Sequence, residues 1–204
     1  PVPSRLLMPI ILREIRAGNP EAEIAILVAT GCHRSPTRQE LLDRYGEDIV
    51  AHERIVIHNA DDDDSLADLG LMASGNRLLL NRVAYEADFL MAEGFIEPHF
   101  FAGFSGGRKA VLPGVVGRAT TMFNHCAANI DNPGARTGLL DHNPIHMDMC
   151  EGAQKAGLEF ILNVVLNAKK EVIGAFSGDL DAAHQAGVNF IRQLCRCKAE
   201  PADI

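Results

Sequence analysis

Short apolar runs alternate along the chain with segments whose apolar residues recur at helical spacing. The runs are rich in β-branched residues, which is the pattern of buried strands. They lie at 23–30, 54–60, 87–94, 160–167 and 171–178. Two further segments, 67–73 and 77–81, flank Ser74-Gly75-Asn76 and predict a hairpin or two short strands. Candidate strands are thus spread over most of the chain.

Helical spacing predicts four main helices between and around these strands. They cover 4–18, 35–46, 144–156 and the segment from Asp179 to about residue 194. Ser4 and Asp179 are the expected caps of the first and last helices, and Pro144 suits a first helical turn. Pro9 fits poorly inside the first helix, which predicts a later start or a kink. A shorter helical segment is expected over 118–124.

This alternation predicts one domain of the α/β class, with a mostly parallel, Rossmann-like sheet covered by helices on both faces. In such sheets, ligands bind beyond the carboxyl ends of the strands. Two of the segments that follow strands carry a histidine, His33 within Gly31-Cys32-His33-Arg34 and His99 within 94–99. We therefore expect both histidines at the ligand-binding edge of the sheet.

Composition limits the partners of the protein. The net charge is −8, which disfavours broad attraction to a nucleic acid backbone or an anionic membrane. Aromatic residues make up 5% of the chain, without tryptophan, so a stacking surface for single strands is not expected. The acidic run 61–64 predicts a solvated loop, because four adjacent carboxylates cannot all face one cation.

The expected compartment is the cytoplasm. No apolar run approaches the roughly 20 residues that span a bilayer, and the first residues lack the features of a signal peptide. The five cysteines have no paired spacing, which predicts reduced thiols. The sequence starts at Pro1 without an initiator methionine, which suggests a piece of a longer protein.

The densest chemical signal is the glycine-rich segment PHFFAGFSGGRKAVLPGVVG, residues 98–117. Its glycines, Gly106 and Gly107 among them, allow backbone N–H groups to approach an anion, and Arg108 and Lys109 would neutralise a phosphate. A surface loop with incidental charges is the alternative. A P-loop does not fit, because Ala110 stands where that motif needs a hydroxyl after the lysine.

Lys109 is a candidate nucleophile as well as a candidate phosphate ligand. It lies between Arg108 and an apolar stretch, and both surroundings lower the pKa of an amine. A phosphate-binding lysine is the commoner role for such a residue, so the residues alone leave both readings open.

The chain has eight histidines, and a single histidine is more often packed or exposed than a ligand. Five are expected to be of that kind: His52, His58, His142, His146 and His184. His125 follows the short helix after the glycine-rich segment and could return to the same pocket as a metal ligand. No conventional zinc spacing supports this.

Three motifs together resemble the nickel-pincer-nucleotide lactate racemase family. They are ATGCHR with His33, EPHFFAGFSGGRKAVLPG with His99 and Lys109, and TTMFNH with His125, in matching order and spacing. The resemblance runs through essentially the whole chain. It identifies the chain as the cofactor-carrying N-terminal domain of a longer racemase.

The resemblance implies a cofactor and a role for each of four residues. The cofactor is nickel held by pyridinium-3,5-bisthiocarboxylic acid mononucleotide, joined to Lys109 through a thioamide. His125 would be the ligand from the protein to nickel, and His33 and His99 the acid–base pair for a small 2-hydroxy acid. Gly106, Gly107 and Arg108 are expected at the nucleotide phosphate.

Two parts of the family pattern lie outside this sequence. The family has an arginine for the substrate carboxylate in an Asp-x-x-Arg-Pro segment, of which only Pro1 is present. Its C-terminal domain, a partner of this one, adds further substrate contacts, including a lysine. We therefore expect residues 1–204 alone to catalyse weakly at most. The alternatives are a non-catalytic cofactor- or phosphate-binding module and a magnesium-dependent phosphotransferase.

Overall fold

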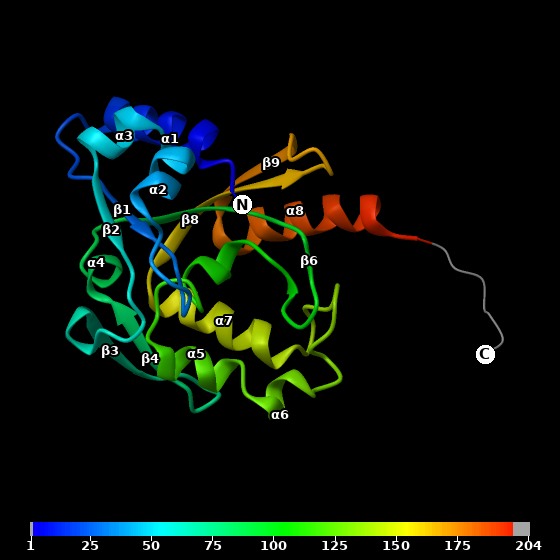
Figure 1. Ribbon diagram of the computed structural model, residues 1–204. Coiled ribbons are helices and arrows are strands. Elements are labelled where there is room, and N and C mark those ends of the chain that lie inside the picture. The colour runs from blue at the N-terminus through cyan, green and yellow to red at the C-terminus, as the bar shows by residue number, and fades with distance from the viewer. Residues whose placement is uncertain (1, 198–204) are drawn as a thin grey trace.

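A computed structural model describes residues 2–197. Helices and strands alternate along the chain, and the helices lie around small sheets (Figure 1). The helices are α1 Ser4–Gly18, α2 Arg38–Tyr45, α3 Glu47–His52, α4 Arg82–Tyr85, α5 Arg118–Asn124, α6 Ala127–Ile130, α7 Pro144–Lys155 and α8 Leu180–Cys195, with 3₁₀ turns η1 Asp63–Ser65 and η2 Gly107–Ala110. The strands are β1 Ala25–Val28, β2 Arg54–Ile57, β3 Leu66–Leu71, β4 Arg77–Asn81, β5 Leu90–Phe95, β6 Pro98–His99, β7 Gly103–Phe104, β8 Leu158–Leu166 and β9 Val172–Asp179.

The α/β class is confirmed, but the expected single, mostly parallel sheet is wrong. The described strands form four small sheets: β1 with β2, β3 with β4, β6 with β7, and β5-β8-β9. Among the strands within residues 2–197, only β1–β2 and β5–β8 are parallel pairs. β9 runs antiparallel to β8. The connection between β8 and β9 is a short turn, and a parallel pair needs a crossover of a dozen or more residues.

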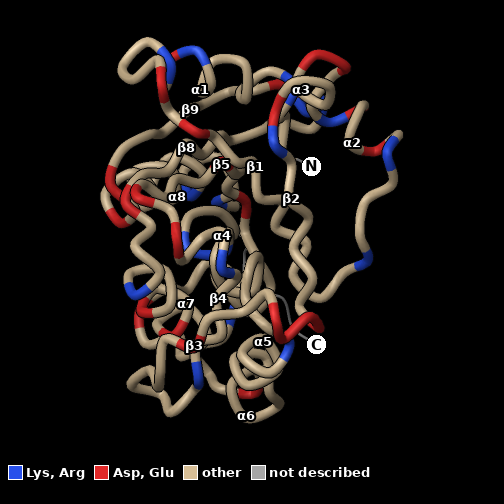
Figure 2. The backbone as a smooth tube through the Cα atoms, turned by 90° about the vertical axis from the view of Figure 1, so that its left-hand side faces the viewer, with Lys and Arg blue, Asp and Glu red and all other residues tan. Residues whose placement is uncertain are grey.

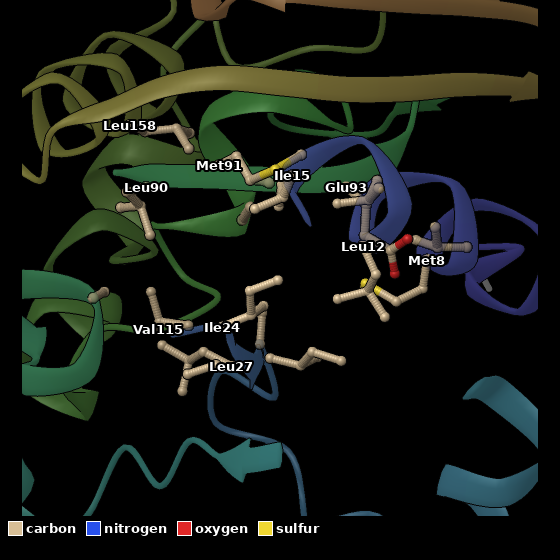
Figure 3. Close-up of a pocket in the computed structure, with 18 of the residues that line it drawn as sticks. Met8, Leu12, Ile15, Ile24, Leu27, Leu90, Met91, Glu93, Val115 and Leu158 are labelled. Atoms are coloured by element: carbon tan, nitrogen blue, oxygen red, sulfur yellow. The ribbon is translucent and has the colours of Figure 1, made fainter. Parts of the chain in front are cut away.

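A cavity separates the two parallel pairs at the place where a continuous sheet would join them. It measures about 260 Å³ and is lined by α1, β1, β5 and the turn that follows Lys109. Figure 3 shows Leu27 on one side and Leu90 and Met91 on the other, pointing into this space. Apolar side chains therefore line a gap between β1 and β5, in place of ladder hydrogen bonds.

The first helix spans the predicted 4–18 and continues through Pro9, so the later start expected from Pro9 is wrong. Pro9 and Arg5 are both exposed, so the Arg5 carbonyl that loses its helical partner can bond water. Ser4 does not act as the cap, which is Pro3. The Ser4 hydroxyl instead donates to Glu93 on β5, and burial raises the pKa of that carboxyl group.

Other local predictions are confirmed. β3 and β4 form the expected antiparallel hairpin, and the acidic run 61–64 is exposed. α5 spans the predicted 118–124. α7 starts with Pro144 in its first turn, and the Asp179 carboxylate caps α8.

Lysine, arginine and acidic residues lie on the same outer segments of the described chain (Figure 2). Figure 2 shows both signs interspersed over the outer segments, without a continuous basic stripe in that view. In residues 2–197 no helix has the length and apolar character needed to cross a bilayer. Three clusters of buried apolar residues support the elements, and two of them, around α7 and around α8, flank the glycine-rich segment.

Candidate active site

The glycine-rich segment folds back on the end of β5. Ser105 fixes this reversal, since its hydroxyl donates to the Phe95 carbonyl (2.9 Å) and accepts from the Glu97 N–H (2.9 Å). His99 and Gly103 pair across the short β6–β7 ladder. Gly103 has φ of 76°, and a Cβ there would lie 2.1 Å from the carbonyl oxygen of residue 139. No other residue fits, so this close approach fixes the course of the loop between His99 and η2.

The loop brings Lys109 and His99 into direct contact. Lys109 Nζ lies 3.0 Å from His99 Nε2, and the Ala102 N–H donates to His99 Nδ1 (3.2 Å). Because Nδ1 accepts, the hydrogen of a neutral imidazole is on Nε2, where it can be donated to Lys109 when that side chain is an uncharged amine. The uncharged amine is the nucleophilic form of Lys109.

The surroundings of this pair lower both pKa values. Burial lowers the pKa of Lys109 to about 8, and the neighbouring Arg108 guanidinium contributes. Burial lowers the pKa of His99 to about 4, with further contributions from Lys109, Arg108 and His125. Each positive charge disfavours the others, so the site resists full protonation near neutral pH.

Phe101 connects this pair to His125. Its ring makes edge contacts with His99 and His125, at centroid distances of 4.6 and 4.9 Å. Lys109 Nζ lies 5.7 Å from the centroid of the same ring. Phe100 stacks on His99 from the exposed side. The sequence reasoning missed both phenylalanines, although their position directly after His99 was a usable signal.

His125 directly follows α5 and is held by the bond from its N–H to the Thr121 carbonyl (2.9 Å). Burial lowers the pKa of His125, and the charge of Lys109 lowers it further. Its Nδ1 atom is buried without a hydrogen-bond partner among the described residues. A neutral imidazole is the form that binds a metal.

His33 lies in the turn after β1. A hydrogen bond joins this turn to the turn that follows Lys109, because the Gly31 N–H donates to the Gly114 carbonyl (2.9 Å). His33 is exposed and lines an opening of about 640 Å³ together with the start of α1. In the described chain no hydrogen bond joins its ring to His99, Lys109 or His125. Three of the four predicted residues therefore converge, and the fourth lines an opening whose lining includes none of the other three.

Arg108 points into the protein, away from solvent. It is 1% exposed. Its guanidinium donates to the carbonyls of Ala102 (2.8 Å) and Gly106 (3.2 Å), and His184 Nε2 lies 3.0 Å away. These partners make Arg108 a support of the turn, with Nε alone buried without a partner among the described residues, and the phosphate contact expected from the sequence stays a prediction.

Gly106 and Gly107 also pack inward. The Gly107 N–H donates to Asn163 Oδ1 (2.7 Å), and a Cβ on Gly106 would lie 2.5 Å from that oxygen. Asn163 on β8 and His184 on α8 are thus supporting residues that the sequence reasoning missed. The two glycines allow the turn to pack against β8 and α8, and the Gly107 N–H is not free to bind an anion.

Comparisons with known proteins agree with the resemblance seen in the sequence. Residues 1–138 match the family model described as the lactate racemase N-terminal domain. The chain is 52% identical over its whole length to the lactate racemase of Lactiplantibacillus plantarum and 48% identical to that of Thermoanaerobacterium thermosaccharolyticum. It covers 48% of each of these curated relatives, so it spans about half of their length.

Solved structures share the fold. The lactate racemase apoprotein of Thermoanaerobacterium thermosaccharolyticum superposes with a TM-score of 0.97 at 48% identity, over 99% of this chain and 48% of that one. A protein from Thermotoga maritima, 24% identical, superposes with a TM-score of 0.71 over 90% of this chain and 49% of that one, which shows a common fold. The match over residues 1–138 covers most of the chain, and the chain belongs to the lactate racemase N-terminal domain family.

Proposed function

We propose that this chain is the cofactor-carrying part of a racemase for lactate or a closely related 2-hydroxy acid. The observation that carries the proposal is the convergence of the Lys109 amine, His99 and His125 around the ring of Phe101. Relatives that share about half of its residues are named lactate racemase. The cofactor that we propose is nickel in the pincer nucleotide expected from the family.

The residues present fit this cofactor. The lowered pKa of Lys109, about 8, makes its free amine accessible near neutral pH for covalent attachment, and the neutral imidazole of His125 suits nickel. In residues 2–197 no group of three or more histidine, cysteine or acidic side chains could hold a metal ion. A site in which His125 is one ligand and the nucleotide supplies the rest agrees with that arrangement.

When bound, the nucleotide would accept the hydride from the substrate carbon. The chain would supply the proton transfers. The two enantiomers present their hydroxyl groups to opposite sides, so one base is needed on each side. We assign these roles to His99 and to His33, which lines the opening beside the start of α1. An imidazole can accept a proton in one direction and return it in the other.

Attachment of the nucleotide would also change the basicity of His99. Acylation of Lys109 Nζ removes the ammonium charge that contributes to the low pKa of His99. Burial and Arg108 would still act, so the pKa of His99 would rise from about 4 without regaining its ordinary value. His99 would thus become a better base when the cofactor is in place.

The rest of the enzyme would cover this site. Phe100, Met122 and Phe123 are large apolar residues that are exposed on the loop and on α5. Apolar surface of this kind is typical of an interface. We therefore propose that residues 1–204 form the N-terminal domain of a longer racemase, and that its other segments close over the cofactor and bind the substrate carboxylate. The described cysteines are free, in agreement with a cytoplasmic enzyme.

A magnesium-dependent phosphotransferase has less support, as does a simple phosphate-binding module. Both need free backbone N–H groups or cations in the glycine-rich turn. The Gly107 N–H is bonded to Asn163, and Arg108 is buried. The apolar faces of Phe100 and Phe101 next to Lys109 are better suited to a flat aromatic ring.

A racemisation assay tests the proposal. The complete protein would be produced with and without the enzymes that make the nickel nucleotide, and each sample incubated with single enantiomers of several 2-hydroxy acids. We expect conversion of lactate or a near relative to a mixture of enantiomers only in the sample with cofactor, since hydride transfer needs it. Nickel-loaded protein that racemises none of these acids would contradict the proposal.

A further inference from the structure

A buried carboxylate on α7 accepts a hydrogen bond from the residue that precedes His125. Asp148 is 4% exposed and forms no ion pair with a lysine or arginine in residues 2–197. Its Oδ1 accepts from the Ser74 hydroxyl (2.5 Å), and its Oδ2 accepts from the side-chain amides of Asn76 (2.9 Å) and Asn124 (2.8 Å). Burial of a charge without a counter-ion is costly, and here neutral donors alone satisfy it.

Asn124 connects this carboxylate to His125. It is the last residue of α5, is fully buried, and directly precedes His125. Its amide group donates to Asp148 and also to the Ile145 carbonyl (3.2 Å). Both hydrogens of this amide are therefore held by α7. The end of α5 can neither rotate nor slide along α7 without breaking these bonds.

The same carboxylate also fixes the start of α5. The Asn76 amide bridges Asp148 and the Thr120 carbonyl (3.0 Å). The Thr120 hydroxyl donates to the Arg77 carbonyl (2.6 Å) and accepts from the Leu79 N–H (3.1 Å), which joins α5 to β4. Asp148 is thus the common acceptor of a buried network that sets the orientation of the whole helix.

α7 also fixes Phe101, whose ring contacts the ring of His125. The amide of Asn143, its cap residue, donates to the Phe101 carbonyl (2.9 Å). Phe101 is the ring against which His125 packs. One helix therefore fixes both members of this contact, Phe101 through Asn143 and His125 through Asp148 and Asn124.

We propose that Asp148 is a positioning residue for His125, because it holds Asn124 and with it the end of α5 where the imidazole meets the cofactor. This inference rests on the proposed role of His125 as the nickel ligand. Asp148 touches neither the cofactor nor the substrate. Its effect is to keep His125 at a fixed distance from Lys109 and Phe101, since groups that orient a metal ligand strongly affect how firmly the metal is held.

The test compares three variants of the complete, cofactor-loaded protein. Asp148→Ala leaves the amides of Asn76 and Asn124 without their acceptor. Asp148→Asn can keep its oxygen toward those amides and turn its own amide toward the Ser74 hydroxyl. Met149→Ala is the matched control, because Met149 is the next residue of α7, is fully buried in the apolar core, and belongs to no part of the network.

Two readouts distinguish positioning from general loss of stability. The first is the rate at which nickel passes to a chelator, which we expect to rise by about 10- to 100-fold in Asp148→Ala and by less than about threefold in the other two variants. The second is the nuclear Overhauser contact between the rings of His125 and Phe101 in the metal-free chain. It should be lost in Asp148→Ala and kept in Met149→Ala.

Folded Asp148→Ala protein with wild-type nickel release and an intact ring contact would overturn the inference. If Asp148→Ala does not fold, Asn124→Ala decides, because it cuts only the link to His125 and leaves Ser74 and Asn76 bonded to Asp148. We expect faster nickel release there too, and wild-type release would overturn the inference. Wild-type protein that binds no nickel would contradict the proposed function, whereas the ring contact would still test the role of Asp148.

Discussion

Replacing either His33 or His99 by alanine should lower the racemisation rate of the loaded, complete enzyme by about 10²- to 10⁴-fold. Each imidazole is assigned to the hydroxyl proton of one enantiomer. Conversion in either direction therefore needs both imidazoles, one to accept a proton and the other to donate one. Neither substitution should remove the cofactor, because His33 is exposed and His99 is only half-buried. The measurement is the rate of racemisation from each pure enantiomer at saturating substrate.

The two variants should differ in the first half of the reaction. In a single turnover, each variant should still form the 2-oxo acid from the enantiomer whose base it keeps. The enantiomer that reacts with His33→Ala should therefore be the mirror image of the one that reacts with His99→Ala. His52→Ala is the matched control, since His52 is exposed on α3, away from the cluster. Two variants that racemise at the wild-type rate would refute the assignment. Loss of the same half-reaction in both would refute the two-sided arrangement.

Acid should destabilise the chain strongly between about pH 6.5 and 4. Five histidines have pKa values below their ordinary value in the folded state, in each case mainly because of burial: His58, His99, His125, His146 and His184. The folded values are about 4 for His99 and His184 and about 3 for His146. Above the unfolded pKa of about 6.5 their contribution to stability is fully present, and it is lost as the pH falls.

The size of this loss follows from proton uptake. Below about pH 6.5 the unfolded chain binds protons that the folded chain does not, which costs up to about 1.4 kcal/mol per pH unit for each histidine. We expect the free energy of unfolding to fall by roughly 5 kcal/mol between pH 6.5 and 4.5, because several histidines titrate together. Glu93, whose pKa burial raises, acts in the opposite direction as a single group. Denaturant unfolding at a series of pH values measures how the free energy of unfolding changes with pH. A free energy of unfolding that stays constant down to pH 5 would contradict this prediction.

Local signals in the sequence predict the helices well, and they predict the sheet poorly. Pro144 and Asp179 mark helix starts by chemistry that acts within one turn, and α7 and α8 begin there. Sheet continuity depends on contacts between distant segments. The cavity between β1 and β5 has no local signature, whereas the short turn between 160–167 and 171–178 could have indicated the antiparallel pair from the sequence.

In the candidate site, too, contacts within one segment could be predicted from the sequence and contacts between distant segments could not. His99 and Lys109 lie ten positions apart in one unusual segment, and their contact follows from that loop. The inward direction of Arg108 depends on His184, 76 positions away. The role of Asp148 depends on Ser74, 74 positions away. Such roles follow from tertiary packing, so residue type and spacing alone did not reveal the inward contacts of Arg108 and gave Asp148 no role.

Peptide mapping by mass spectrometry of the complete protein, purified after production with the nickel-nucleotide pathway, most directly tests the central claim. The free amine of Lys109, in contact with His99 and close to His125, should carry the nucleotide, so the peptide that contains Lys109 should have the added mass and no other lysine peptide should. An adduct on a different residue, or nickel-loaded and active enzyme with an unmodified Lys109, would contradict the claim.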